Sequence, residues 1–300
     1  MDKIFFIGII IGILSRLIML HLDQKQYPTE PNILLSQLVL AFVASALGSL
    51  LVPALIERSY TSITFLSLAA QQFRQVRDNR RDTLQNLEDV QLIQRGNAFI
   101  EEISSTYESR SYISLFSSLV ASVIYIYFAR AYKFGFLPCT ILAAIGGVIV
   151  GFIFKRYLRR SSIGDIADVV EAKINFDGPI LKVNDVFIEN IGLEDTRSKY
   201  LKEGIAIEII PKNMKAYGVV SDLGQRQAVL HNLFIHFGIN KDIDEKDLLA
   251  TTKINLDKNT VVIPYLPLVK DIDELIKVVK STPILEVSKG KQSAYSGEKL

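Results

Sequence analysis

Few residues in this chain of 300 have the types and spacing that chemistry requires. His231 and His236 lie five positions apart in a stretch that we predict to be helical, and this spacing does not align them on one helical face. We expect no metal ligation from them and interpret both as partly exposed helix histidines. The sequence has no phosphate-binding loop, no GxSxG motif and no paired cysteines. We therefore predict no catalytic, cofactor-binding or metal-binding residues, and we expect the protein not to be an enzyme.

Two further features give only weak indications of a chemical role. The run from Asp222 to Gln227 could open a helix, and the N-terminus of a helix can hold an anion. Cys139, the single cysteine, lies in an apolar run and cannot form an internal disulfide. We interpret it as a small apolar packing residue.

Arg16 occupies the least expected position of any charged residue, because it lies inside an apolar run. A charge within a membrane-spanning segment is costly and usually faces a protein interior or water. Arg16 is therefore a candidate pore-lining or anion-contacting residue. The alternative is that its long side chain extends to the membrane interface.

Arg16 lies in the first of four apolar runs, and these runs determine where its side chain can lie. A helix is the only open-chain structure that satisfies every backbone amide in hydrocarbon, so each run is predicted to be a transmembrane helix. The runs are residues 4–20, 33–56, 113–129 and 136–154. No small-x-small cleavage site follows the first run, so we interpret it as an uncleaved anchor. Gly147 and Gly151 have the four-residue spacing that allows two helix backbones to approach closely.

The orientation of these runs is predicted from their basic flanks. Seven arginines lie between the second and third runs, and four basic residues directly follow the fourth run. In contrast, the loop of residues 23–32 has a single basic residue, Lys25. The positive-inside rule then places both termini in the cytoplasm. The expected fold is a helical membrane protein with two transmembrane hairpins, residues 1–56 and 113–154, and a cytosolic C-terminal domain.

Residues 57–112, between the two hairpins, are predicted to form a cytosolic helical arm. Apolar residues recur there at spacings of three and four, which is typical of an amphipathic helix. One interpretation is a helix that packs on the cytosolic domain of its own chain. The other is an assembly surface between subunits, and the sequence does not choose between them.

The C-terminal domain is predicted to span residues 160–288 and to have an α/β or α+β fold. Its predicted elements are a β-hairpin over 180–189, strands at 205–210, 261–263 and 284–287, and helices over 223–237 and 271–280. The polar residues 289–300 are predicted to be a disordered tail.

The central region resembles a known family. The stretches Leu68–Arg77 and Arg95–Ile103 are similar to the YIEGIA family of membrane proteins from spore-forming Firmicutes. The family's name-giving hexapeptide corresponds to Phe99, Ile100, Glu101, Glu102, Ile103 and Ser104, with Glu102 in the glycine position. A second string, Glu203–Ala206, reproduces the last four letters, and we prefer the first because its surroundings also match.

The segments 163–168 and 176–180 also resemble the family, so the similarity covers most of the chain. The resemblance implies a role in sporulation or in the spore membrane. It transfers no active-site residues and no cofactor. Because Glu102 replaces glycine, any role that requires close backbone approach at that position is in doubt.

These observations predict a non-enzymatic subunit of an oligomeric membrane complex, with a channel-like subunit as one form. The expected partners are the lipid bilayer and further copies of the chain or a small partner subunit. The net charge of +2 gives no reason to expect nucleic acid. The expected location is the cell membrane or the inner spore membrane. A secondary transporter and a membrane-anchored enzyme with its site in the C-terminal domain are the alternatives.

Overall fold

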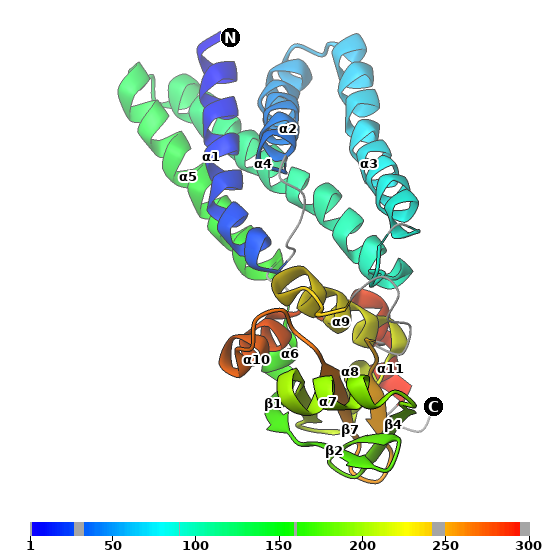
Figure 1. Cartoon of the computed structure of the whole chain (residues 1–300). Helices are drawn as coiled ribbons and strands as arrows, with labels where there is room; N and C mark the ends of the chain where they lie inside the picture. The colour runs from blue at the N-terminus through cyan, green and yellow to red at the C-terminus, as the bar shows by residue number, and fades with distance from the viewer. Residues whose placement is uncertain (1, 27–32, 90, 159–160, 242–249, 295–300) are drawn as a thin grey trace. The chain divides into compact units, whose positions relative to one another are not determined.

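The computed structural model describes residues 2–26, 33–89, 91–158, 161–241 and 250–294. The chain folds into two compact units. We call residues 1–84 with 103–159 the helical unit, and residues 85–102 with 160–300 the C-terminal unit. Figure 1 shows the helices of the first unit in blue to green and the mixed structure of the second in green to red.

Five helices account for the helical unit. They are α1 (Asp2–Gln26), α2 (Ile33–Ile56), α3 (Tyr60–Glu88), α4 (Asn97–Ala131) and α5 (Phe136–Leu158). All four predicted apolar runs are helical, and the third is part of the much longer α4. The last residues of α3 and the first residues of α4 belong to the C-terminal unit.

Three helices in the described part of the chain are long and apolar enough to cross a membrane. These are residues Gln37–Ile56 of α2, Asn97–Ala131 (α4) and Phe136–Tyr157 of α5. The fourth predicted span lies in α1, and its crossing of the membrane stays a prediction.

The directions of the helices differ from the predicted topology. Lys3 Nζ lies 5.2 Å from the centre of the Phe136 ring, and a Cβ on Gly151 would lie 3.0 Å from Ser15 Cβ. The beginning of α1 is thus beside the beginning of α5, and the later part of α1 is beside the later part of α5. The two helices run in the same direction. Four alternating spans with both termini on one side would require α1 and α5 to run in opposite directions, so the predicted topology is not confirmed.

The reason for this difference is α3. Helix α1 runs antiparallel to α2, because a Cβ on Gly8 would meet Ser49 and one on Gly12 would meet Ser45. A chain in which α1 and α5 are parallel needs one more helix that runs the length of the unit. The 29 residues of α3 extend about 43 Å and form this helix. The sequence does not indicate that α3 extends along the unit, because the apolar start of α3 is short and its second half is charged.

Glycines bring the helices of this unit close together. A Cβ on Gly147 would lie 2.3 Å from Ile11 Cγ2, and one on Gly48 would lie 2.2 Å from the carbonyl oxygen of Leu115. The close contact predicted from the spacing of Gly147 and Gly151 is therefore present, between α5 and α1. Cys139 is buried, as expected for a packing residue.

The C-terminal unit contains two antiparallel sheets. The four-stranded sheet has the order β1 (Ala167–Ala172), β5 (Ile205–Pro211), β7 (Thr260–Tyr265) and β6 (Lys253–Asn255). The three-stranded sheet has the order β2 (Ile174–Asp177), β3 (Ile180–Val183) and β4 (Val186–Asn190). Antiparallel sheets with helices around them make this an α+β fold.

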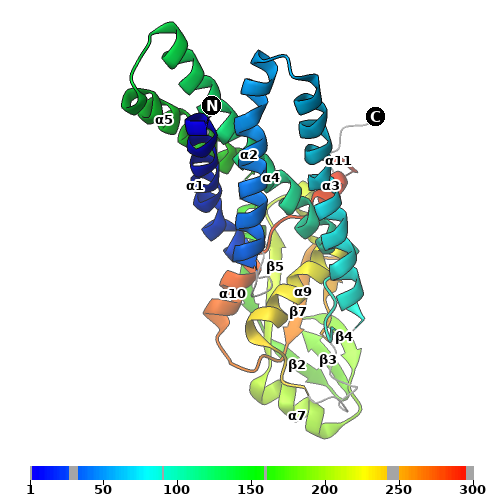
Figure 2. The ribbon, with the colours of Figure 1, turned by 90° about the horizontal axis from the view of Figure 1, so that it is seen from above.

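The helices of this unit are α6 (Ile163–Ile166), α7 (Glu194–Glu203), α8 (Met214–Val220), α9 (Leu223–Phe237), α10 (Ile272–Ser281) and α11 (Glu286–Ala294). Figure 2 shows α9 lying over β5 and β7. There Val229, Leu230 and Leu233 form one hydrophobic core with Ile207 and Val261. A second core lies on the other side of the sheet, where Ala206 and Val262 join the three-stranded sheet and α7.

Most predicted elements of the C-terminal unit are confirmed, with one exception at its end. The hairpin, the strand ending at Pro211 and the helices α9 and α10 are present. The predicted strand over 284–287 is wrong, because Glu286 begins α11, and this helix also includes residues 289–294 of the predicted disordered tail. Residues 295–300 lie outside the described part.

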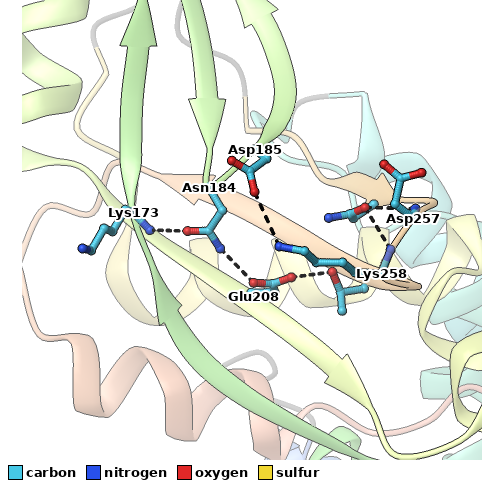
Figure 3. Close-up of polar contacts among 8 residues, drawn as sticks. Lys173, Asn184, Asp185, Glu208, Asp257 and Lys258 are labelled. Atoms are coloured by element: carbon cyan, nitrogen blue, oxygen red, sulfur yellow. Dashed lines mark hydrogen bonds and ion pairs between the residues drawn. The ribbon is translucent and has the colours of Figure 1, made fainter.

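A buried carboxylate joins the two sheets (Figure 3). Glu208 on β5 accepts hydrogen bonds from Asn184 Nδ2 at 2.8 Å and from Thr260 Oγ1 at 2.5 Å. Asn184 lies in the turn between β3 and β4 with φ of 51°, a conformation that asparagine tolerates better than most residues. Lys258 forms an ion pair with Asp185 of the same turn, at 3.5 Å. Both oxygens of Glu208 are bonded, so this group is a structural connection.

Candidate functional site

The buried side chains of the helical unit are largely small or polar. Among the described residues they include Ser15, Arg16, Gln37, Ser45, Ser49, Ser104, Arg110, Ser111, Ser114, Ser117, Ser118 and Ser122. Helices α1, α2 and α4 all contribute to this set, which we call the polar core. A polar core is unfavourable in a protein surrounded by water, but it is common where lipid surrounds the bundle.

Arg16 lies within the polar core. It is 2% exposed, and its Nη2 donates a hydrogen bond to Gln37 Oε1 at 2.6 Å. Gln37 on α2 is itself 8% exposed. This burial argues against a side chain that extends outward to the interface. A role for Arg16 in lining a pore or contacting an anion stays a prediction.

The serines of the polar core differ in their hydrogen bonding. Ser45 Oγ donates to the carbonyl oxygen of Ala41 at 2.6 Å, as serines in membrane helices often do. The hydroxyls of Ser114, Ser117 and Ser122 on α4 have no hydrogen-bond partner among the described residues. A buried hydroxyl without a partner costs free energy, so the face of α4 that holds them has unused hydrogen-bonding capacity.

The outward surface of the helical unit is strongly apolar. Stripes of exposed large side chains run along α1 (Phe6, Ile10, Leu14, Leu17) and along α5 (Leu137, Ile141, Ile145, Ile149, Phe152). At the turn between α4 and α5, the Phe128 ring stacks on the rings of Tyr132 and Phe134, which are tilted relative to each other. Aromatic residues of this kind are enriched where a membrane meets water.

A second candidate site lies in the C-terminal unit, where part of the predicted arm is bound. We call residues 85–102 the docked linker. The side chain of His231 on α9 contacts the carbonyl oxygen of Ile93 through Nδ1 at 2.8 Å. Gln227, also on α9, donates from Nε2 to the carbonyl oxygen of Gln94 at 2.5 Å. For this segment the interpretation of packing on the chain's own domain is supported.

The docked linker is held in a tight turn by Glu88. Its Oε2 accepts from the backbone N–H of Gly96 at 2.9 Å, and Arg95 Nη1 lies 3.4 Å from Oε1. Gly96 has φ of 81°, which favours glycine at this position. This turn connects the end of α3 to the start of α4.

The residues of the predicted family hexapeptide follow this turn. Phe99 and Ile100 are buried, and the Phe99 ring meets the His231 ring edge to face with centroids 6.2 Å apart. Glu102 is buried and accepts from the backbone N–H of Glu286 at 3.1 Å. It therefore caps the start of α11, a role that glycine could not have. Ile103 and Ser104, both buried, already belong to the helical unit, and Glu101 is partly exposed.

The second candidate string for that hexapeptide behaves differently. A Cβ on Gly204 would lie 2.3 Å from the carbonyl oxygen of Tyr200 and 2.8 Å from the side chain of Ile174. Close approach to a backbone oxygen and to a side chain therefore exists at Gly204. Which string corresponds to the name-giving sequence stays open.

The histidine prediction needs a correction. His236 is exposed, but His231 is 2% exposed, so it is a core residue and not a partly exposed one. Burial is the main cause of a lowered pKa for His231, and Arg95 adds to the effect, whereas the Ile93 carbonyl and Glu88 oppose it. Among the described residues there is no group of three or more side chains that could hold a metal ion.

The predicted anion site at Asp222 also needs a correction. Asp222 caps α9, as its Oδ1 accepts from the backbone N–H of Gln225 at 3.2 Å and from Ser288 Oγ at 3.0 Å. The carboxylate of the protein thus occupies the place that an external anion would take. The predicted helix start is confirmed.

The sequence analysis left open whether residues 85–102 pack within the C-terminal unit. The available signal was a set of apolar residues in this stretch, among them Ile93, Phe99 and Ile100. All three are at least 94% buried. His231, which contacts Ile93 and Phe99, lies more than 120 positions away, and the spacing of apolar residues cannot indicate such a partner.

Comparison with known proteins gives one clear relationship. The model of the YIEGIA protein family matches residues 4–295. The "Uncharacterized protein YphB" of Bacillus subtilis (strain 168) is 34% identical over 280 residues, which cover 93% of this chain and 91% of that protein. No solved structure matches.

Proposed function

This chain belongs to the YIEGIA family, and from its apolar helices and polar core we propose that it is an integral membrane protein that acts as a non-enzymatic subunit of a membrane complex. The observation that carries this proposal is the reversed distribution of side chains in the helical unit. Serines and Arg16 are buried beside a smaller number of large apolar residues such as Ile11 and Leu47, and stripes of leucines, isoleucines and phenylalanines are exposed. Hydrocarbon around the bundle makes this distribution favourable, whereas water would not.

The complex is proposed to be a homo-oligomer. Glycine contacts close the interior of a single bundle, for example between Gly48 and Leu115. A route for ions or small solutes would then form between copies of the chain, and a channel-like complex is one form of the proposal. A small partner subunit in place of a second copy is the alternative.

The proposed topology follows from the parallel directions of α1 and α5. The C-terminal unit is cytoplasmic, as the basic residues at the end of α5 favour. The start of α1 then lies on the opposite side of the membrane, and α3 returns the chain to the cytoplasm. This replaces the prediction that both termini are cytoplasmic.

The proposed location is the cell membrane or the inner spore membrane, with a role in sporulation. The support is the family, which the sequence resemblance connects with spore-forming Firmicutes. The proposed macromolecular partners are the bilayer and further copies of the chain, without nucleic acid.

Labelling of single cysteines in intact cells tests the topology. In a Cys139→Ser background, a membrane-impermeant maleimide should label Lys133→Cys from outside and Lys270→Cys only after lysis, under either topology. Lys3→Cys discriminates, because we expect labelling from outside. Labelling of Lys3→Cys only after lysis would restore the original topology. Release of the protein from membranes by alkaline carbonate would reject membrane integration itself.

Crosslinking in native membranes tests the complex. We expect a ladder of products in multiples of 33.7 kDa, the mass of one chain. Monomer alone, with no second protein attached, would reject the complex and leave the membrane location intact.

A further inference from the structure

The docked linker contacts a histidine, His231, whose ring is buried. A carbonyl oxygen can only accept a hydrogen bond, so the contact of 2.8 Å with Ile93 requires a proton on His231 Nδ1. A second proton on Nε2 would keep this hydrogen bond but would place a positive charge on the buried ring. The ring is 2% exposed and lies against the rings of Phe99 and Phe234. These apolar neighbours solvate a charged ring less well than water does.

The charged groups that face His231 come from the docked linker itself. Arg95 repels a protonated ring, and Glu88 attracts one. These two side chains form an ion pair with each other at 3.4 Å, so their effects on the ring largely oppose one another. Burial of the ring is the larger effect, and it favours the neutral form.

We propose that docking of residues 85–102 on α9 is sensitive to pH, and that protonation of His231 releases this linker from the C-terminal unit. The released segment includes Gly96, Phe99 and Ile100, which form the entry to α4. Since α4 is one of the helices that can cross a membrane, acidification would change the chain at the point where the C-terminal unit leads into that helix.

The sign and size of the effect follow from linkage. The pKa of His231 is lower when the linker is docked than when the ring is in water, so the undocked form binds more protons. Docking is therefore at full strength well above pH 6.5 and weakens as the pH falls below that value. At pH 5 the docking equilibrium can fall by at most about 30-fold relative to neutral pH.

Hydrogen exchange of the full-length protein in detergent tests the proposal. Amide exchange in residues 91–100 is measured at pH 7 and pH 5 and corrected for the intrinsic pH dependence of exchange. In the wild type we expect several-fold faster corrected exchange at pH 5 in this segment, while β5 and β7 keep their protection. No acceleration in the wild type overturns the proposal.

Two variants of histidines on the same helix test whether His231 is the group that causes the pH response. His231→Asn keeps an N–H donor near the position of Nδ1 but cannot titrate, so its corrected exchange should be the same at both pH values. His236→Asn removes the exposed histidine five positions later and should respond as the wild type does. An equal response in His231→Asn would overturn the proposal.

If His231→Asn already exchanges fast at pH 7, the wild-type titration decides instead. Its midpoint must lie below pH 6.5, and a profile that stays flat down to pH 5 overturns the proposal.

Discussion

The interiors of the two units differ in composition, because the helical unit buries many serines and the C-terminal unit buries mainly branched apolar side chains. In the helical unit, Ser117 is fully buried on α4 while Ile145 on α5 is 52% exposed. In the C-terminal unit, Leu233 is fully buried on α9 while lysines such as Lys277 remain outside. We attribute the difference to the proposed surrounding medium, because hydrocarbon gives no reward for burying apolar side chains and water does.

The two interiors are also held together differently. In the helical unit, small residues allow backbones to approach, as at Gly48 and Gly147. In the C-terminal unit, branched apolar side chains fill the space between a sheet and its helices. Substitutions that act on one mechanism should therefore leave the other unit nearly unaffected.

The largest effect is expected for Gly48→Leu. A Cβ alone would lie 2.2 Å from the carbonyl oxygen of Leu115, and backbone cannot move aside as a side chain can. We expect α2 and α4 to separate, with loss of a monodisperse peak in detergent size-exclusion chromatography. Gly135→Ala is the control, since its Cβ would meet only Pro138 Cδ at 4.0 Å. A normal elution profile for Gly48→Leu would show that close approach is not what assembles the bundle.

The next effect is expected for Leu233→Ala in the C-terminal unit. Removal of a fully buried leucine side chain should lower the free energy of unfolding of this unit by about 2–5 kcal/mol. The matched variant Ile145→Ala, on the outward face of α5, should change stability in detergent by less than about 1 kcal/mol. Urea unfolding of both variants is the measurement. Similar losses would contradict the reversed arrangement of the two units.

A smaller effect is expected for Thr260→Val. This change keeps the shape of the side chain but removes the hydroxyl that donates to Glu208 at 2.5 Å. Loss of a hydrogen bond to a charged group should destabilise the C-terminal unit by about 1.5–3 kcal/mol. Thr251→Val, at a half-buried position outside this network, serves as the comparison. Equal stability of the two variants would mean that Glu208 does not hold the sheets together.

The smallest effect is expected for Ser117→Ala in the polar core. Its hydroxyl is buried without a hydrogen-bond partner among the described residues, so its removal should be neutral or stabilising by up to about 1 kcal/mol. Thermal unfolding in detergent measures this. A clear destabilisation would show that the hydroxyl bonds to a group from outside the chain, such as a water molecule or a second copy.

Some of these features could be read from the sequence. The apolar run 33–56 coincides with α2, and the predicted helix 223–237 coincides with α9. Periodicity was sufficient there because the pattern belongs to one continuous element. It failed over residues 284–287, where the apolar residues suggest a strand but Glu102 caps a helix from 184 positions away.

The sequence by itself determined that the first half of the chain suits hydrocarbon and the second half suits water, because that choice depends on local composition. Only the tertiary structure decided that α1 and α5 are parallel, that Arg16 is paired with Gln37 inside the bundle, and that residues 85–102 fold with the C-terminal unit. Each of these depends on which distant residues meet. Helix direction and the burial of a charge depend on those distant partners. The sequence of one segment does not show which partners it will contact.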